Sequence, residues 1–150
     1  MRVAEARGVV PLEPAAALAL WLDTERWPTF VEGFGHVTEA DPSWPEPGAR
    51  IGWESTPGGR GKVTERIVER GAGRVVSQVF EDALSGTQTV RFLEAPGGAA
   101  VEVALEYALA RGGPLRELAD MVFIRRALRD ALRRTLRRFA VEAEDEAGLR

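Results

Sequence analysis

Hydrophobic and polar residues alternate over much of the chain between residues 34 and 110, and this period of two predicts β-strands. The alternation is most regular in "VEVALEYAL" (101–109), which gives a strand one buried face and one solvent-facing side. Turns rich in glycine and proline separate the segments, so we expect antiparallel hairpins. The six segments are "GHVTEAD", "ARIGWEST", "GKVTERIVE", "RVVSQVFED", "TQTVRFLE" and "AVEVALEYALA".

The first 30 residues predict a strand followed by two short helices. "RVAEARGVV" (2–10) mixes β-branched and polar residues, as strands do. Pro14 suits the first turn of a helix, and the apolar residues of "AALALWL" (16–22) then recur with helical spacing. We expect a second helical turn to end at "RWPTF" (26–30), because Pro28 does not allow a preceding helix simply to continue.

A long amphipathic helix is predicted near the C-terminus, over about residues 115–143. At about 100° per residue its apolar side chains fall in a single arc. The acidic tail, about residues 144–150, is expected to be frayed. The arc contains Leu118, Met121, Leu128, Leu132, Leu136 and Phe139.

The order of these elements predicts an α+β fold. A seven-stranded antiparallel sheet with one apolar face and a long helix with one apolar arc bury both surfaces if the sheet curls around the helix. The two short helices after the first strand then close one end of the curl. The chain contains no repeat, low-complexity segment or linker, so residues 1–150 are predicted to form a single domain.

The composition excludes several kinds of site. The chain has no cysteine, which removes disulfides, thiolate zinc sites and cysteine nucleophiles. A multi-histidine metal site is excluded because His36 is the only histidine, and we expect no metal and no cofactor. No Ser–His–Asp spacing surrounds His36. A structural or exposed position and a role in proton transfer both stay open for it.

Charge and hydropathy give expectations about partners and location. The formal net charge of -3 does not argue for a nucleic-acid partner, and we expect none. The chain lacks a run of about 20 apolar residues, so we expect no stable membrane insertion. The stretch "PAAALALWL" (14–22) has acidic residues on both sides and no small-residue cleavage pattern after it, unlike a signal peptide. We therefore expect a cytoplasmic protein.

The predicted C-terminal helix is strongly basic. Eight arginines stand against three acidic residues between positions 116 and 138. These arginines either form the solvated side of the helix or bind an anionic membrane or another partner. Phe123 lies on the polar side, which indicates a dimer contact, a membrane contact or an irregular start of the helix. A homodimer is therefore among the expected assemblies.

The element order and several motifs resemble the START-like helix-grip superfamily, in particular its bacterial polyketide cyclase/dehydrase-like (SRPBCC) branch. The resemblance covers essentially the whole chain. It implies an elongated cavity between the sheet and the C-terminal helix that accepts lipids, sterols, polyketides or aromatic compounds. It is carried by "PLEPAAALALWLDTERWPTF" (11–30), "GWESTPGGRGKVTERIVE" (52–69), the strand pair "FED…SGTQTVRF" (80–92) and the C-terminal helix.

The resemblance leaves three functions to be separated. The first is binding of a hydrophobic or aromatic small molecule, lipid- or polyketide-like, in that cavity. The second is a cyclase or dehydratase activity with acid–base residues in the same cavity. The strand "KVTERIVER" (62–70) weighs against it, because it lacks the aromatic residues that cyclase members often carry there. The third is an interaction module that uses the basic helix.

Glu65 is a candidate acid or base. It shares a strand face with Val63 and Ile67, and a carboxyl group in an apolar pocket has a raised pKa. An ion pair with an arginine such as Arg125 is the structural alternative. The opposite register would place the face of Thr64 and Arg66 inside, and the sequence leaves the two registers open.

Arg125 is a second candidate because it falls inside the apolar arc of the C-terminal helix. Its guanidinium either reaches the cavity to hold a carboxylate or enolate, or lies at the rim or pairs with a structural carboxylate. Tyr107 is the third candidate, since its buried hydroxyl must find a partner.

The aromatic residues of the strands and of "RWPTF" complete the predicted site. Cavity wall and solid core look alike in a sequence, so both roles stay open for each of them. We expect at least one of Trp27 and Phe30 to contact the cavity. Gln88, on the face of Val90 and Phe92, either orients a ligand or is exposed. The predicted cavity residues are Trp27, Phe30, Trp53, Glu65, Phe80, Gln88, Val90, Phe92, Tyr107 and Arg125.

Overall fold

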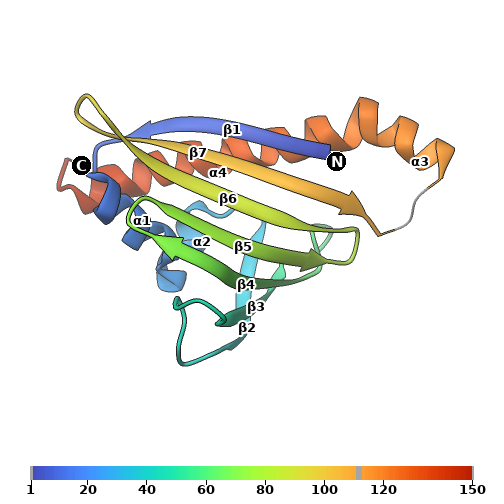
Figure 1. Ribbon diagram of the computed structural model, residues 1–150, viewed down its shortest axis with the longest axis horizontal. Helices are drawn as coiled ribbons and strands as arrows, with labels where there is room; N and C mark the ends of the chain where they lie inside the picture. The colour runs from blue at the N-terminus through green and yellow to red at the C-terminus, as the bar shows by residue number, and fades with distance from the viewer. Residues whose placement is uncertain (1, 111–112, 150) are drawn as a thin grey trace.

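The computed structural model describes residues 2–110 and 113–149 and contains one seven-stranded antiparallel sheet. The strand order is β1-β7-β6-β5-β4-β3-β2, so only the β1–β7 pair joins strands distant in sequence. Figure 1 shows these strands side by side as one curved layer. The strands are β1 Arg2–Val10, β2 Phe34–Ala40, β3 Arg50–Ser55, β4 Lys62–Gly71, β5 Arg74–Glu81, β6 Leu84–Ala95 and β7 Gly98–Leu109.

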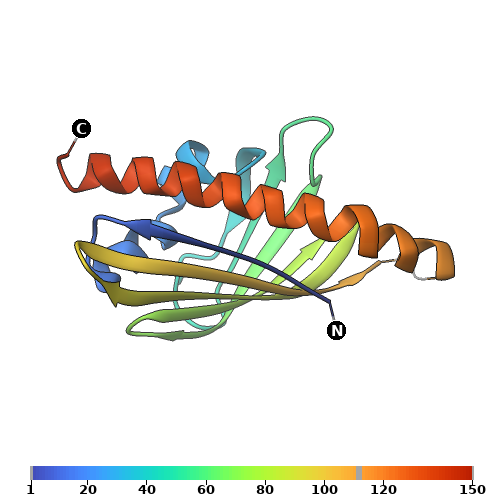
Figure 2. The same ribbon diagram turned by 90° about the horizontal axis from the view of Figure 1, so that it is seen from above.

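The helices lie on one face of this sheet. Figure 2 shows the long C-terminal helix crossing the face and its first turns extending past the strands at one end. The predicted helix-grip architecture is confirmed, with a seven-stranded sheet around one long helix. We call the space between the sheet and α4 the grip. The helical segments are α1 Pro14–Leu22, η1 Thr24–Arg26, α2 Trp27–Phe30, α3 Pro114–Ala119, η2 Asp120–Ile124 and α4 Arg125–Glu146.

Aromatic packing closes one end of the grip. The rings of Trp21, Phe30 and Phe139 meet with centroid distances of 4.9 to 5.6 Å, two of the three pairs edge to face. Trp27 is buried and donates its indole N–H to the carbonyl oxygen of Trp21 at 2.8 Å. Pro28 occupies the first turn of α2, so "RWPTF" forms the second short helix and packs its two aromatics under α4.

A π-helical turn, η2, interrupts the long helix where the sequence predicted a regular one. This wider turn holds one more residue than an α-helical turn and therefore shifts the side chains before it around the axis. As a result Asp120 is 1 % exposed, whereas Leu118 and Met121 are 55 % and 66 % exposed. The prediction of a single apolar arc from Leu118 onward was therefore wrong over its first turns.

The C-terminal end of the helix is longer than predicted. α4 continues through Glu146, so the first three residues of the expected frayed tail are helical. Arg26 of η1 forms ion pairs with these last turns. Its Nη2 lies 2.6 Å from Oε1 of Glu142, and its Nη1 lies 2.8 Å from Oε2 of Glu146. Hydrogen bonds from Thr29 and Arg26 lower the pKa of Glu142. These contacts fix α4 against the short helices at the closed end of the grip.

Candidate functional site

Two neighbouring pockets lie in the grip. The outer pocket has a volume of about 340 Å³ and lies between α4 and the β3–β4 loop, residues 56–61. The inner pocket has a volume of about 50 Å³ and reaches toward α1, α2 and β4. Because four residues line both of them, they form one path from the surface inward. The shared residues are Arg60, Gln88, Leu132 and Thr135.

The walls of the path are apolar over most of their length. Leu105 of β7 and Leu128, Ala131 and Leu132 of α4 line the outer pocket. Aromatic side chains dominate the inner pocket, and they come from α1 and α2. They are Trp21, Trp27 and Phe30.

Glu65 is the acidic residue of the inner pocket. It stands between Val63 and Ile67 on the inward face of β4, and both of these neighbouring side chains are 1 % exposed. Strand pairing places Glu65 opposite Ile51 of β3 and Val79 of β5. The register that the sequence left open is therefore the one that turns Glu65 into the grip.

The Glu65 carboxylate has no hydrogen bond or ion pair with any side chain in the part of the chain that the structure describes. Burial raises the pKa of Glu65 above its ordinary value, the charge of Arg60 lowers it, and the charge of Glu81 raises it. Burial is the largest of these effects. The pocket thus contains a carboxyl group that is more readily protonated than an ordinary glutamate.

Arg60 enters the pocket from the β3–β4 loop and is already paired. Its Nη2 and Nε lie 2.6 and 2.8 Å from one carboxylate oxygen of Glu81, whose side chain is 5 % exposed. The guanidinium carbon lies 5.0 Å from the ring centroid of Trp53, a cation–π contact. Glu81 therefore neutralises the charge of Arg60, and Glu65 does not share in this ion pair.

Four predicted site residues meet at the inner pocket: Trp27, Phe30, Glu65 and Gln88. Gln88 lines the outer pocket as well. Trp53 and Val90 are buried in the core, but neither lines these two pockets.

Phe80 lies on the other face of the sheet. It is 51 % exposed, and its neighbours Val79 and Glu81 turn inward instead. The prediction that Phe80 lines the cavity was wrong, because β5 places the polar residues Ser77 and Glu81 on its inward face and Phe80 on the outward one.

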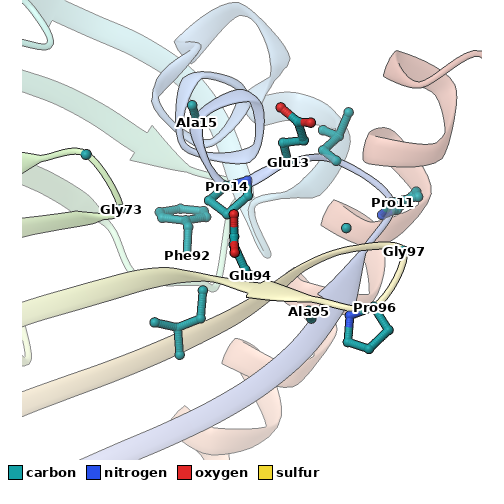
Figure 3. Close-up of a pocket in the computed structure, with 14 residues that line it drawn as sticks. Pro11, Glu13, Pro14, Ala15, Gly73, Phe92, Glu94, Ala95, Pro96 and Gly97 are labelled. Atoms are coloured by element: carbon teal, nitrogen blue, oxygen red, sulfur yellow. The ribbon is translucent and has the colours of Figure 1, made fainter.

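Phe92 lines a different hollow, of about 1040 Å³, at the end of the sheet. Figure 3 shows its ring beside Gly73 and Pro14, with the β6–β7 turn on the other side. This hollow lies outside the grip, and prolines, glycines and alanines provide much of its lining. Its two charged residues are Glu13 and Glu94. We therefore do not take it as the functional site.

Tyr107 belongs to a separate polar cluster. Its hydroxyl donates to Asp120 at 2.5 Å, and both residues are buried. Asp120 also pairs with Arg2 of β1, which in turn contacts Glu117 at 3.3 Å. Burial raises the pKa of Tyr107, the contact with Asp120 raises it further, and a hydrogen bond with Arg125 lowers it. The cluster connects the π-helical turn to β1 and β7.

Arg125 is exposed and lines neither pocket of the grip. The expected position of Arg125 in the cavity was wrong, because Arg125 lies at the first residue of α4, beyond the two pockets, where it hydrogen-bonds Tyr107 of the polar cluster. His36 is 68 % exposed and lies 3.9 Å from Glu54, away from the pockets.

Sequence reasoning missed Arg60, Glu81 and Thr135. Thr135 is buried between two apolar turns of α4, and its hydroxyl accepts the backbone N–H of Glu32 at 3.0 Å. A threonine inside the apolar arc and a glutamate on the inward side of β5 were signals that could have identified two of the three. Arg60 lies in a glycine-rich loop, where the alternation of hydrophobic and polar residues does not indicate which way a side chain points.

Comparison with known proteins places the chain in a family. Residues 1–144 match the family described as polyketide cyclase/dehydrase and lipid transport, and the chain belongs to it. The fold is that of the SRPBCC superfamily, whose members bind hydrophobic ligands. No curated protein sequence matches the chain.

Solved structures with low sequence identity share the fold. TTHA0849 from Thermus thermophilus has a TM-score of 0.74 at 17% identity, with 97% of this chain and 99% of that chain covered. The di-domain aromatase/cyclase StfQ of the steffimycin biosynthetic pathway has a TM-score of 0.74 at 15% identity, with 97% of this chain and 51% of that chain covered. A point mutant of norcoclaurine synthase from Thalictrum flavum, in complex with a transition-state analogue, has a TM-score of 0.71 at 11% identity, with 97% of this chain and 96% of that chain covered.

Two other kinds of feature, a metal-binding cluster and a membrane-spanning helix, are absent from the described residues. Among the described residues, His, Cys, Asp and Glu side chains form no group of three that could hold a metal ion. Within the same residues, each helix is too short or too polar to cross a membrane.

Proposed function

We propose that the protein binds a hydrophobic or aromatic small molecule in the grip, with the ligand entering between α4 and the β3–β4 loop. One observation supports this most strongly. A pocket with leucine walls leads into an aromatic inner end where Glu65 has no partner among the described side chains. Glu65 is partly buried and its carboxylate oxygens stay accessible to solvent, so a ligand in the inner pocket can replace water as their partner.

The volumes limit the size of the ligand. Pockets for small molecules commonly measure about 300–1,000 Å³, and the outer pocket of about 340 Å³ lies at the lower end of that range. A ligand of two or three fused or linked rings fits such a space. A long polyketide chain or a sterol would require the β3–β4 loop to move away from α4.

A matched pair of tryptophan substitutions tests this proposal. Ala131 lines the outer pocket, whereas Ala127, one turn earlier in α4, is exposed and lines neither pocket of the grip. N-phenyl-1-naphthylamine is a neutral aromatic probe that fluoresces in apolar surroundings. We expect Ala131→Trp to weaken its binding at least tenfold and Ala127→Trp to change it less than twofold. Equal binding by both variants and the wild type would contradict the site.

An acid–base reaction in the same pocket is the second candidate, and the raised pKa of Glu65 favours it. A carboxyl group with a raised pKa keeps its proton to a higher pH than an ordinary glutamate and can therefore act as a general acid. The roles expected for Tyr107 and Arg125 have no support, since both residues lie outside the two pockets. If the protein is an enzyme, Glu65→Gln should abolish turnover of a bound substrate and leave its binding within about threefold. Retained turnover would exclude Glu65 as the acid or base.

A third candidate, docking on an anionic membrane, is favoured by the exposed start of the long helix. Five large apolar residues are exposed there, and the exposed arginines Arg126 and Arg129 follow. Sedimentation with phosphatidylglycerol vesicles should then carry the wild type down at low salt but not the Arg126→Gln/Arg129→Gln variant. A wild type that stays in the supernatant would exclude membrane docking. The apolar residues are Leu115, Leu118, Met121, Val122 and Phe123.

A further inference from the structure

The inner pocket contains polar groups whose hydrogen-bonding capacity is not used. The Glu65 carboxylate and the Gln88 amide both line it, and no hydrogen bond joins either of them to another described side chain. Thr135 uses its oxygen to accept from Glu32, which leaves its O–H free to donate. These groups converge on one small space at the inner end of an apolar path.

The charged side chains of the pocket show which group has no partner. Arg60 and Glu81 form a close ion pair through two contacts to one carboxylate oxygen. Among the described side chains, Glu65 then remains as a carboxyl group with no cation or donor of its own. Glu65 is partly buried and its carboxylate oxygens are free to accept, so the ligand group that pairs with them is a hydrogen-bond donor.

The size of the inner pocket limits what reaches Glu65. A volume of about 50 Å³ holds one to a few non-hydrogen atoms, on the scale of about 30 Å³ for one water molecule in the liquid. An aromatic ring is too large for it, whereas a hydroxyl or an amine fits. The apolar body of a ligand must therefore stay in the outer pocket while its polar end passes Leu132 and Gln88.

We infer that the ligand is an apolar or aromatic molecule that ends in a hydrogen-bond donor, a hydroxyl or a protonated amine, and that this donor binds Glu65 in the inner pocket. This inference rests on the proposed binding function. It also states what the site rejects. A ligand carboxylate would leave Glu65 without a donor and bring a second negative charge beside it, while Glu81 already balances the positive charge of Arg60.

Four naphthalene derivatives on one skeleton test this inference. They are 2-methylnaphthalene, 2-naphthalenemethanol, 2-naphthylmethylamine and 2-naphthoate, each measured by displacement of N-phenyl-1-naphthylamine at pH 7. We expect the alcohol and the amine to bind at least tenfold more tightly than the carboxylate. If both the alcohol and the amine bind, the ratio between them identifies which donor the site prefers.

The variant Glu65→Gln keeps the size of the side chain and removes its charge. We expect it to bring the amine and the carboxylate to within about threefold of each other. Glu69→Gln is the matched control, because Glu69 lies on the same strand with its side chain 60% exposed. It should keep the ranking of the wild type. Circular dichroism and thermal unfolding verify that both variants are folded.

The outcomes separate this inference from the function on which it rests. Tight binding of the carboxylate by the wild type, or an unchanged ranking in Glu65→Gln, overturns the donor assignment while the binding function stands. If neither the probe nor any of the four compounds binds, the binding function fails and the inference fails with it. The wild-type ranking alone decides the question if Glu65→Gln does not fold.

Discussion

Two acidic side chains of the grip, Asp120 and Glu65, differ in their burial and in their partners. In the π-helical turn before α4, Asp120 is 1 % exposed, and it accepts from Tyr107 at 2.5 Å and pairs with Arg2. At the closed end Glu65 faces a pocket and has no partner among the described side chains. The comparison teaches that a buried acid alone does not mark a functional site. The distinction is whether side chains of the protein supply the hydrogen bonds and the counter-charge of the carboxylate.

The partnered acid should matter most for stability. Asp120→Ala removes the counter-charge of Arg2 and leaves the buried Tyr107 hydroxyl without its acceptor, and leaving such a group unpaired costs about 1–3 kcal/mol. We expect the free energy of unfolding in urea to fall by about that amount. The control is Glu117→Ala, because this exposed residue also contacts Arg2 and should cost below about 1 kcal/mol. Equal effects of the two substitutions would remove the contrast between the two acidic side chains.

The unpartnered acid should behave in the opposite way. Glu65→Gln removes a carboxyl group that is disfavoured in its charged form, so we expect the variant to be more stable than the wild type at pH 8. Urea unfolding at pH 8 measures this difference. A variant that is less stable would mean that the Glu65 carboxylate has a partner within the protein.

The pH dependence gives a smaller and more specific effect. Because the folded-state pKa of Glu65 is raised, folding favours its protonated form, and this contribution is fully present below the unfolded-state pKa of about 4.3. It is lost as the pH rises through the folded-state pKa. The stability of the wild type minus that of Glu65→Gln should therefore decrease as the pH rises above about 4.3. A difference that stays constant with pH would show that the pKa of Glu65 is not raised.

The sequence predicted the sheet, because period-two alternation reports on burial directly, but it left open which face of "KVTERIVER" (62–70) is inward. Val63 and Ile67 are nearly inaccessible, as the alternation of β4 requires, and Glu65 follows their direction. The same rule misled for β5. Phe80 is outward and Glu81 is inward there, because an ion pair with Arg60 compensates the buried carboxylate. Such a compensation depends on a loop residue that alternation does not describe.

The helix shows a second limit. Helical spacing assumes about 100° per residue, and the π-helical turn at Asp120–Ile124 breaks that assumption. Leu118 and Met121 are therefore exposed, and Asp120 is buried in their place. The acid–tyrosine contact that holds this turn joins β7 to the helix, so its cause lies in tertiary packing rather than in local propensity.

A crystal structure of the protein with 2-naphthalenemethanol would test the central claim most directly. We expect the rings in the outer pocket against Leu128 and Leu132, and the hydroxyl within hydrogen-bonding distance of the Glu65 carboxylate. A ligand bound in the hollow beside Phe92, or against the exposed apolar residues at the start of the long helix, would contradict the assignment of the grip as the binding site.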